Sequence, residues 1–382
     1  MPSFRQSTKE EYAKYGTSTG YSRSQGCYLY RANRLITYAT WWRIIKNQDS
    51  NQLVRIEIDI SNKFPSWWTE QESLYLKKID NLHKSLKYIA FRYKFKRFPV
   101  DKVVTDFPLY VLIEPVSVCN LRCPFCFQMD KEFTRKPYAG VMEMDLFKRV
   151  VDECEQNGTQ AVTLASRGEP TLHPKLPEML EYLKGKFFEI KLNTNGTRLT
   201  DSLCHDIFKN EVNDVVLSID SDKKELFEML RKNAIFEEVL ENVRNLKRIR
   251  DEYYPDSVTA IRISGVKFTP EQDNESFMKF WNDLADEITI SASEERWDTY
   301  NNKTKPQLTE PCALLWERFY VWYDGTCNPC DVDYMSKLSP GILTETESIK
   351  SIWNSESYKS LRSTHLKKLR SKYNPCDRCG VY

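Results

Sequence analysis

The sequence lacks a long apolar run: none approaches the roughly 20 residues that a membrane-spanning helix needs. Its first residues, MPSFRQSTKEEY, also lack the apolar stretch of a secretory signal. The charge balance is nearly even, with 56 Lys and Arg against 54 Asp and Glu, so the overall charge indicates no partner. We therefore expect a cytoplasmic protein with no membrane partner.

The rest of the composition is that of a folded protein, with 41% hydrophobic and 29% charged residues. A chain of 382 residues can hold an enzyme domain and one or two smaller modules. Basic residues gather near the N-terminus, and 84–97 carries six of them with no acidic residue. This stretch is either the solvated face of a helix or a docking surface for a polyanion such as a nucleotide sugar, nucleic acid or acidic peptide.

From about residue 108, strand-like and helix-like segments alternate. The expected strands are 109–114, 160–165, 187–192, 214–219, 258–264 and 286–291. The expected helices are 143–157, 174–184, 200–209, 222–250 and 271–283, with Thr200 at an N-cap. Six β/α units in series predict an α/β fold, a partial (β/α)6 TIM-like barrel whose chemistry lies at the carboxyl ends of the strands.

Three domains follow from this pattern. Residues 1–107 form a basic, aromatic-rich N-terminal extension of unknown fold, with a strand-like alternation at 54–60 and a helical apolar stripe at 79–93. Residues 108–300 form the barrel, and 301–382 form a small, cysteine-bearing C-terminal module. In that module we expect a hairpin that turns at Asp324-Gly325 and a helix at about 346–370.

Cysteine is abundant for a cytoplasmic protein, where disulfides rarely persist, so clustered cysteines indicate metal. Eight of the eleven fall into two groups: 119, 123 and 126, and then 312, 327, 330, 376 and 379. The other three, Cys27, Cys154 and Cys204, stand alone and are interpreted as buried small hydrophobes.

The first group lies in the loop after the first barrel strand, EPVSVCNLRCPFCF. Three thiolates so closely spaced can hold an iron–sulfur cluster and leave one iron without a protein ligand, as chemistry at a metal requires. The alternative is a zinc site, although zinc more often takes two CxxC pairs.

This Cys119-x3-Cys123-x2-Cys126 spacing, with Phe125 before the last cysteine, resembles the signature of the radical S-adenosylmethionine (SAM) superfamily. The resemblance covers about residues 108–292. It implies a [4Fe–4S] cluster with an open iron for SAM, and reductive cleavage of SAM to a 5′-deoxyadenosyl radical that abstracts a substrate hydrogen. It also implies an electron donor such as flavodoxin or ferredoxin.

Later strand ends match the same family. SRGEP at 166–170 resembles its Gly-Gly-Glu-Pro motif, which receives the SAM amino group, but Arg167 stands where the family has its first glycine. The resemblance gives Ser218 a contact with SAM and Arg231 a contact with its carboxylate, to which a planar guanidinium is suited. The cofactor-binding residues it implies are Phe125, Gly168, Glu169, Asn193, Ser218 and Arg231.

The second cysteine group resembles the SPASM/twitch extension of the same superfamily, through Cys312-x12-Gly325-x4-Cys330 and a terminal CxxC. This implies one auxiliary [4Fe–4S] cluster held by Cys312, Cys330, Cys376 and Cys379. The rival interpretation replaces Cys312 by Cys327 and forms a zinc ribbon from two CxxC pairs.

Three functions remain open from the sequence. The first is net oxidation of a carbohydrate or nucleotide-linked small molecule, by resemblance to single-auxiliary-cluster enzymes. The second is oxidation, crosslinking or epimerisation of a ribosomally made peptide, with residues 1–107 as a binding site for its leader. The third is a non-catalytic iron–sulfur or zinc protein that binds nucleic acid.

Overall fold

The computed structural model describes residues 29–31, 34–36, 72, 75–76, 79, 82–293 and 297–381. The chain forms two compact units, of which one is Lys9–Asp101 and the other contains Lys102–Tyr382. No described helix combines the length and the apolar composition that crossing a membrane requires.

In the first unit, β1 (Leu29–Arg31) pairs antiparallel with β2 (Arg34–Ile36), and α5 spans Leu82–Asp101. The apolar stripe faces inward, since Ile79, Leu86, Ile89 and Tyr93 are buried. The expected strand at 54–60 lies outside the described residues. The six basic residues of 84–97 are exposed or half-buried around this stripe.

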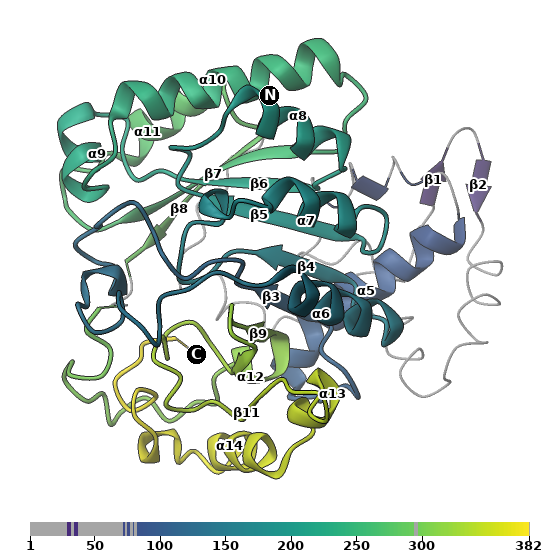
Figure 1. The fold of residues 1–382 in the computed structure, drawn as a ribbon, viewed down its shortest axis with the longest axis vertical. Helices are drawn as coiled ribbons and strands as arrows, with labels where there is room; N and C mark the ends of the chain where they lie inside the picture. The colour runs from purple at the N-terminus through teal and green to yellow at the C-terminus, as the bar shows by residue number, and fades with distance from the viewer. Residues whose placement is uncertain are drawn as a thin grey trace, which may run out of the picture. The chain divides into compact units, whose positions relative to one another are not determined.

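The second unit is built on a parallel sheet, which confirms the six-stranded partial barrel. Its strands are β3 (Tyr110–Ile113), β4 (Ala161–Leu164), β5 (Glu189–Thr194), β6 (Asp214–Ser218), β7 (Ala260–Lys267) and β8 (Glu287–Ala292). In Figure 1 these strands lie one beside the next in chain order. All their carboxyl ends therefore lie at one edge.

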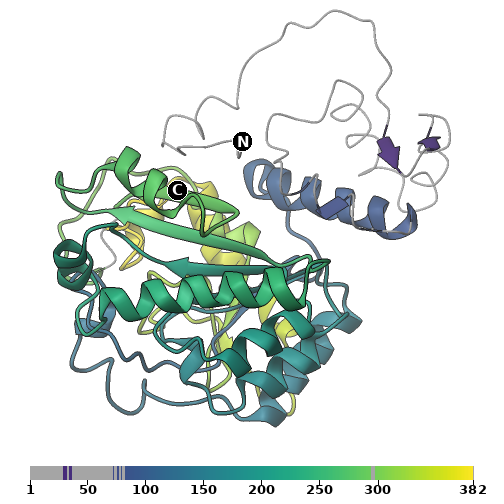
Figure 2. The same ribbon diagram turned by 90° about the horizontal axis from the view of Figure 1, so that it is seen from above.

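The barrel helices are α6 (Met144–Gln156), α7 (Leu176–Leu183), α8 (Asp201–Lys209), α9 (Lys224–Leu230), α10 (Phe236–Tyr253) and α11 (Asn274–Trp281). Thr200 caps α8 by accepting the amide of Leu203, as the sequence predicted. Figure 2 shows the teal and green helices outside the strands. The single helix expected at 222–250 is wrong: α9 ends before Arg231, whose side chain turns to Asp220, and Asn233 takes a positive φ of 77° that a helix does not allow.

The C-terminal module continues the barrel sheet. Its elements are α12 (Leu314–Glu317), β9 (Phe319–Val321), β10 (Thr326–Asn328), β11 (Gly341–Ile342), α13 (Ile349–Trp353) and α14 (Glu356–Leu366). The expected hairpin is β9–β10, and β9 also pairs in parallel with β3. The order β11-β10-β9-β3-β4-β5-β6-β7-β8 makes one nine-stranded sheet. The single helix expected at 346–370 is two helices: α13 ends at Trp353, and Ser355 caps the N-terminus of α14.

Candidate functional site

The three clustered cysteines lie on the loop that follows β3. The amide of Cys126 donates to the carbonyl of Cys123 over 3.0 Å, and the amide of Leu121 donates to Sγ of Cys119 over 3.4 Å. The thiol of Cys119 lies within electrostatic reach of the other two. Burial raises the pKa of Cys119 to about 12, so its thiol is neutral on its own. A bound metal would displace that proton, as cysteine ligation requires.

The segment after β4 packs directly on this loop. A Cβ on Gly168 would lie 2.1 Å from the carbonyl oxygen of Val116 and 2.6 Å from that of Val118, so only glycine allows this approach. The amide of Glu169 donates to the Val118 carbonyl over 2.9 Å. The sharp turn comes from Ser166, which has a φ of 113°, and not from Arg167 at the position of the family's glycine.

Glu169 is 3% exposed and its carboxylate accepts several hydrogen bonds. The hydroxyls of Thr171 and Thr194 and the amide of Asn195 each donate to it over 2.7 Å. Burial raises its pKa, and these donors oppose that rise. The carboxylate is thus held rigidly beside Cys119, on which it acts electrostatically.

The end of β5 supplies amide groups near the same cysteine. Asn195 donates through Nδ2 to Oδ1 of Asn120 over 2.9 Å and lies 3.9 Å from Sγ of Cys119. Within the described part of the chain, neither the buried side-chain oxygen of Asn193, on β5, nor the hydroxyl of Ser166 has a hydrogen-bond partner. Buried groups left without partners are uncommon, and here they fit a polar cofactor such as SAM.

Beyond β6, Arg231 meets the cysteine loop from the other side. Its Nε donates to the fully buried Asp220 over 2.6 Å, and its guanidinium carbon lies 5.6 Å from the ring centre of Phe125. Burial raises the pKa of Cys123, and the guanidinium beside it opposes that rise. The ring of Phe125 stacks on Phe268 with centroids 3.7 Å apart. Predicted cofactor-binding residues from three strand ends therefore surround the cysteine loop.

Ser218 ends β6, in register with Ser264 of β7, at the same edge of the sheet. Three residues that the sequence reasoning missed also belong to this region: Asn195, Asp220 and Gln128. Gln128 donates to the carbonyls of Ser117 and Arg167 over 2.8 and 2.6 Å and so joins the loop to the β4 turn. The third residue of NTNGT and the last of LSID were within quoted motifs, but nothing in the spacing distinguished Asn195 or Asp220 from their neighbours.

Four C-terminal cysteines lie within electrostatic reach of one another although 67 positions separate Cys312 from Cys379 in the sequence. Cys330 lies within electrostatic reach of Cys312, Cys376 and Cys379. Burial raises the pKa of Cys312 to about 11, and the thiol of Cys379 adds to the rise. His365 accepts the Cys312 amide through Nδ1 over 3.3 Å, and its buried Nε2 has no partner among the residues that the structure describes. The donor set suits a thiolate-ligated cluster.

Cys327 points elsewhere. It is fully buried on β10, its Sγ lies 3.7 Å from the carbonyl oxygen of Gly325, and Cys154 acts electrostatically on its pKa. Burial raises its pKa well above the usual value. Since Cys327 faces the core shared with α6, the geometry does not support the zinc ribbon that would need it beside Cys330.

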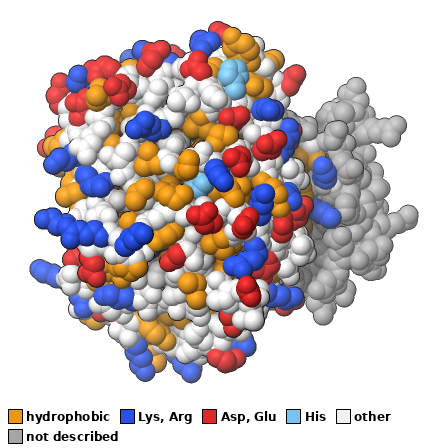
Figure 3. Space-filling view, viewed as in Figure 1, with side chains coloured by type: hydrophobic (Ala, Val, Ile, Leu, Met, Phe, Trp, Pro, Cys, Tyr) orange, Lys and Arg blue, Asp and Glu red, His pale blue; other side chains and the backbone are white. Residues whose placement is uncertain are grey.

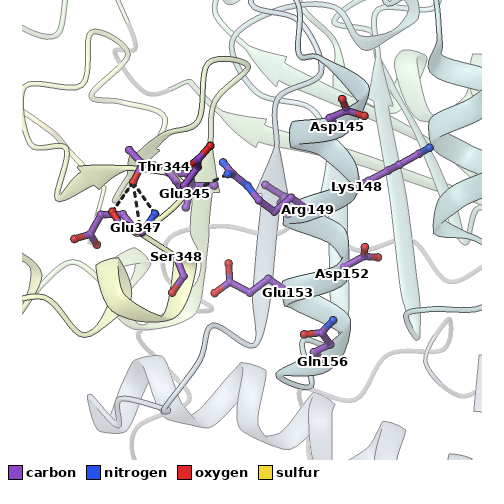
Figure 4. Close-up of a pocket in the computed structure, with 13 residues that line it drawn as sticks. Asp145, Lys148, Arg149, Asp152, Glu153, Gln156, Thr344, Glu345, Glu347 and Ser348 are labelled. Atoms are coloured by element: carbon purple, nitrogen blue, oxygen red, sulfur yellow. Dashed lines mark hydrogen bonds between the residues drawn. The ribbon is translucent and has the colours of Figure 1, made fainter.

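A cavity of about 510 Å³ lies apart from both cysteine groups, between α6 and the loop 343–348. Figure 4 shows charged side chains of both signs along it, including Lys148, Arg149 and Asp152 on the helix and Glu345 and Glu347 on the loop. None of the predicted site residues lines it. On the face seen in Figure 3, Lys and Arg are likewise interspersed with Asp and Glu.

Comparison with known proteins places two family models on the chain. Residues 113–280 match the radical SAM superfamily, and 312–380 match the SPASM iron–sulfur cluster-binding domain. A curated relative is the tungsten-containing aldehyde ferredoxin oxidoreductase cofactor-modifying protein of Pyrococcus furiosus. It is 34% identical over 112 residues, which are 29% of this chain and only 30% of that protein.

Two solved structures share the fold at 16% sequence identity. BtrN, in complex with AdoMet and 2-DOIA, has a TM-score of 0.50 over 73% of this chain and 94% of BtrN. Streptococcus suis SuiB, bound to its precursor peptide SuiA, has a TM-score of 0.55 over 79% of this chain and 76% of SuiB.

Proposed function

Since the chain is a radical SAM superfamily enzyme with a C-terminal SPASM iron–sulfur domain, we propose that it abstracts hydrogen from a carbohydrate or nucleotide-linked small molecule and oxidises it. When bound and reduced, the cluster supplies the electron that cleaves SAM to methionine and a 5′-deoxyadenosyl radical. SAM, the radical SAM cluster and a SPASM auxiliary cluster are the cofactors of such an enzyme.

The residues around the cysteine loop fit the parts of SAM. Cys119, Cys123 and Cys126 would hold the first cluster. The Glu169 carboxylate, buried and oriented by its donors, would accept the charged amino group of SAM. Arg231 carries a guanidinium paired to Asp220 through Nε, and its remaining nitrogens would meet the SAM carboxylate. The side-chain oxygen of Asn193, which has no partner among the described residues, would accept a hydrogen bond from SAM.

One observation supports net oxidation most strongly. Four thiols of the module converge while Cys327 is buried away from them. Cys312, Cys330, Cys376 and Cys379 would therefore ligate a single closed auxiliary cluster, with no open iron of its own. Such a cluster suits electron transfer, so it would accept an electron from a substrate radical, and flavodoxin or ferredoxin would supply the reducing electron to the other cluster.

The proposed substrate class rests on similarity to two solved structures. The match extends over 94% of BtrN, whose structure holds 2-DOIA, which favours a small molecule. The match with SuiB bound to its precursor peptide has the higher TM-score, 0.55, and favours a peptide substrate as the second candidate. Membership in an enzyme family argues against the third hypothesis, a non-catalytic protein that binds nucleic acid.

The test is SAM cleavage by the full chain. Anaerobically reconstituted protein with dithionite and SAM should release 5′-deoxyadenosine, measured by liquid chromatography. Cys123→Ala should abolish the product because two thiolates do not retain the cluster, whereas Cys204→Ala, at a buried lone cysteine of α8, should leave it. Product from the Cys119/Cys123/Cys126 triple alanine variant would contradict the assignment. Neighbouring genes separate the substrates: glycosyltransferases favour the small molecule, and a short precursor gene favours the peptide.

A further inference from the structure

Arg167 is buried at the junction of the barrel and the C-terminal module. Its side chain is 3% exposed and that of its partner, Glu114, is 0% exposed. Nε and Nη2 of Arg167 donate to the two oxygens of Glu114 over 2.6 and 2.5 Å, and the Arg167 amide donates to the same carboxylate over 3.2 Å. A guanidinium bound through two parallel hydrogen bonds has a fixed orientation.

The rest of this guanidinium faces the module. Nη1 donates to the carbonyl of Tyr334 over 2.8 Å. The guanidinium carbon lies 4.2 Å from the ring centre of Trp322 and 5.3 Å from that of Phe133. Trp322 follows β9 and Tyr334 follows β10, whereas Phe133 lies in the loop after β3 and Glu114 directly follows β3. One side chain therefore joins both parts of the sheet.

The backbone of Arg167 belongs to the SAM-binding turn. Its carbonyl accepts Gln128, and the next two residues are Gly168 and Glu169. A displacement of the arginine would therefore move the segment that presents the Glu169 carboxylate.

We propose that Arg167 is a positioning residue that fastens the C-terminal module to the carboxyl ends of β3 and β4 and thereby holds the SAM-binding turn in its active shape. The fastening follows from the contacts alone, whereas the effect on SAM rests on the proposed function. A glycine at this position, as in the family motif, could make none of the side-chain contacts.

The experiment measures docking and binding separately on the full chain. Docking is measured by hydrogen–deuterium exchange of the amides of 335–338. These amides donate to Tyr300 and Asp333, next to the Tyr334 carbonyl. Isothermal titration calorimetry of the reconstituted protein measures its affinity for SAM. The variants are Arg167→Met and Arg167→Lys, and also Arg167→Met with Glu114→Gln, which avoids a buried unpaired carboxylate and so keeps the test readable if the single variant does not fold.

Arg149 gives a matched control. It also joins the barrel to the module, through Nη1 to the Thr344 carbonyl over 3.2 Å, but at the solvated cavity of Figure 4. An exposed contact of this kind contributes little. Arg149→Met should therefore leave exchange at 335–338 and SAM affinity unchanged.

We expect the double variant to raise exchange at 335–338 and to weaken SAM binding about tenfold, the size of coupling seen within one hydrogen-bond network. Lysine, which lacks the planar fork, should not restore either. Unchanged exchange would overturn the fastening, and faster exchange with unchanged SAM affinity would overturn the coupling. If the wild-type protein itself binds no SAM, the proposed function fails while the exchange result still decides the fastening.

Discussion

At the scale of single residues, the proposed chemistry depends on side chains whose partners come from other strand ends. Glu169 takes its donors from β5, and Arg231 takes its carboxylate from the segment after β6. Each pair is buried, so removing one member leaves the other without compensation, and such substitutions have large effects.

Glu169→Gln should weaken SAM binding by about 1.5–3 kcal/mol, because a neutral amide replaces the carboxylate that we propose accepts the SAM amino group. Isothermal titration of the reconstituted protein measures it. Glu178→Gln, on the first turn of α7, is the control and should have no effect. Unchanged affinity in Glu169→Gln would mean that the amino group binds elsewhere.

Cys312 and Cys327 should behave differently in the Cys119/Cys123/Cys126→Ala background, where only the auxiliary cluster remains. That background should retain about four irons with an absorbance that bleaches on reduction. Cys312→Ser should remove them, whereas Cys327→Ser should leave them, because Cys327 lies in the core beside Cys154. Iron analysis distinguishes these outcomes. A colourless protein that contains one zinc would favour a structural metal and a redox-neutral reaction.

At the scale of elements, loops carry the three cysteines of the first group and the four predicted ligands of the second, and buried polar side chains determine the shape of those loops. In the C-terminal loop this is done by Arg370 of the short helix Arg370–Lys372, which is 1% exposed. It donates to four carbonyls, those of Glu310, Cys376, Cys379 and Val381, over 3.0–3.3 Å. Two of the four belong to predicted cluster ligands.

Arg370→Gln should therefore lower the iron retained by the module, because glutamine cannot reach several carbonyls at once. Arg370→Lys should not rescue it, since an ammonium lacks the planar set of five donors. Lys372→Gln, exposed in the same helix, is the control. Iron content and the electron paramagnetic resonance spectrum of the reduced triple-alanine background measure the effect, and a normal spectrum in Arg370→Gln would contradict it.

At the scale of the whole molecule, the barrel and the C-terminal module of 102–382 share one sheet and one core. β9 pairs with β3, and Phe319, Ile349 and Trp353 of the module belong to the same buried cluster as Val111 and Phe147 of the barrel. Neither part can expose its side of this core without exposing apolar surface of the other.

We expect this unit to unfold in one cooperative transition. In guanidinium chloride, tryptophan fluorescence, which includes Trp281 of the barrel and Trp353 of the module, and circular dichroism of the barrel helices should have the same midpoint. Trp281→Phe removes the contribution of that barrel tryptophan, and the difference from the wild type reports on the barrel. A separate, earlier transition of Trp353 would show that the module is an independent domain.

The sequence by itself determined the features that depend on local spacing. The period of the apolar residues predicted six strands within three residues of their observed ends, and the Cys-x3-Cys-x2-Cys motif identified the loop that carries the first cysteine group. Glycine at 168 followed from the motif, and its reason is the close approach to Val116. Local patterns suffice here because a strand, a cap or a ligand loop is specified by neighbouring residues.

Only the tertiary structure decided which distant residues meet. The pairing of Arg167 with Glu114, of Arg231 with Asp220, and the separation of Cys327 from Cys330 have no local signal. The helix predicted across 222–250 is wrong for the same reason. The hydrogen bond of Arg231 to the buried Asp220 outweighs the helix propensity of the neighbouring residues. Buried polar groups must find partners wherever the fold brings them, and that requirement is set by three-dimensional packing and not by sequence distance.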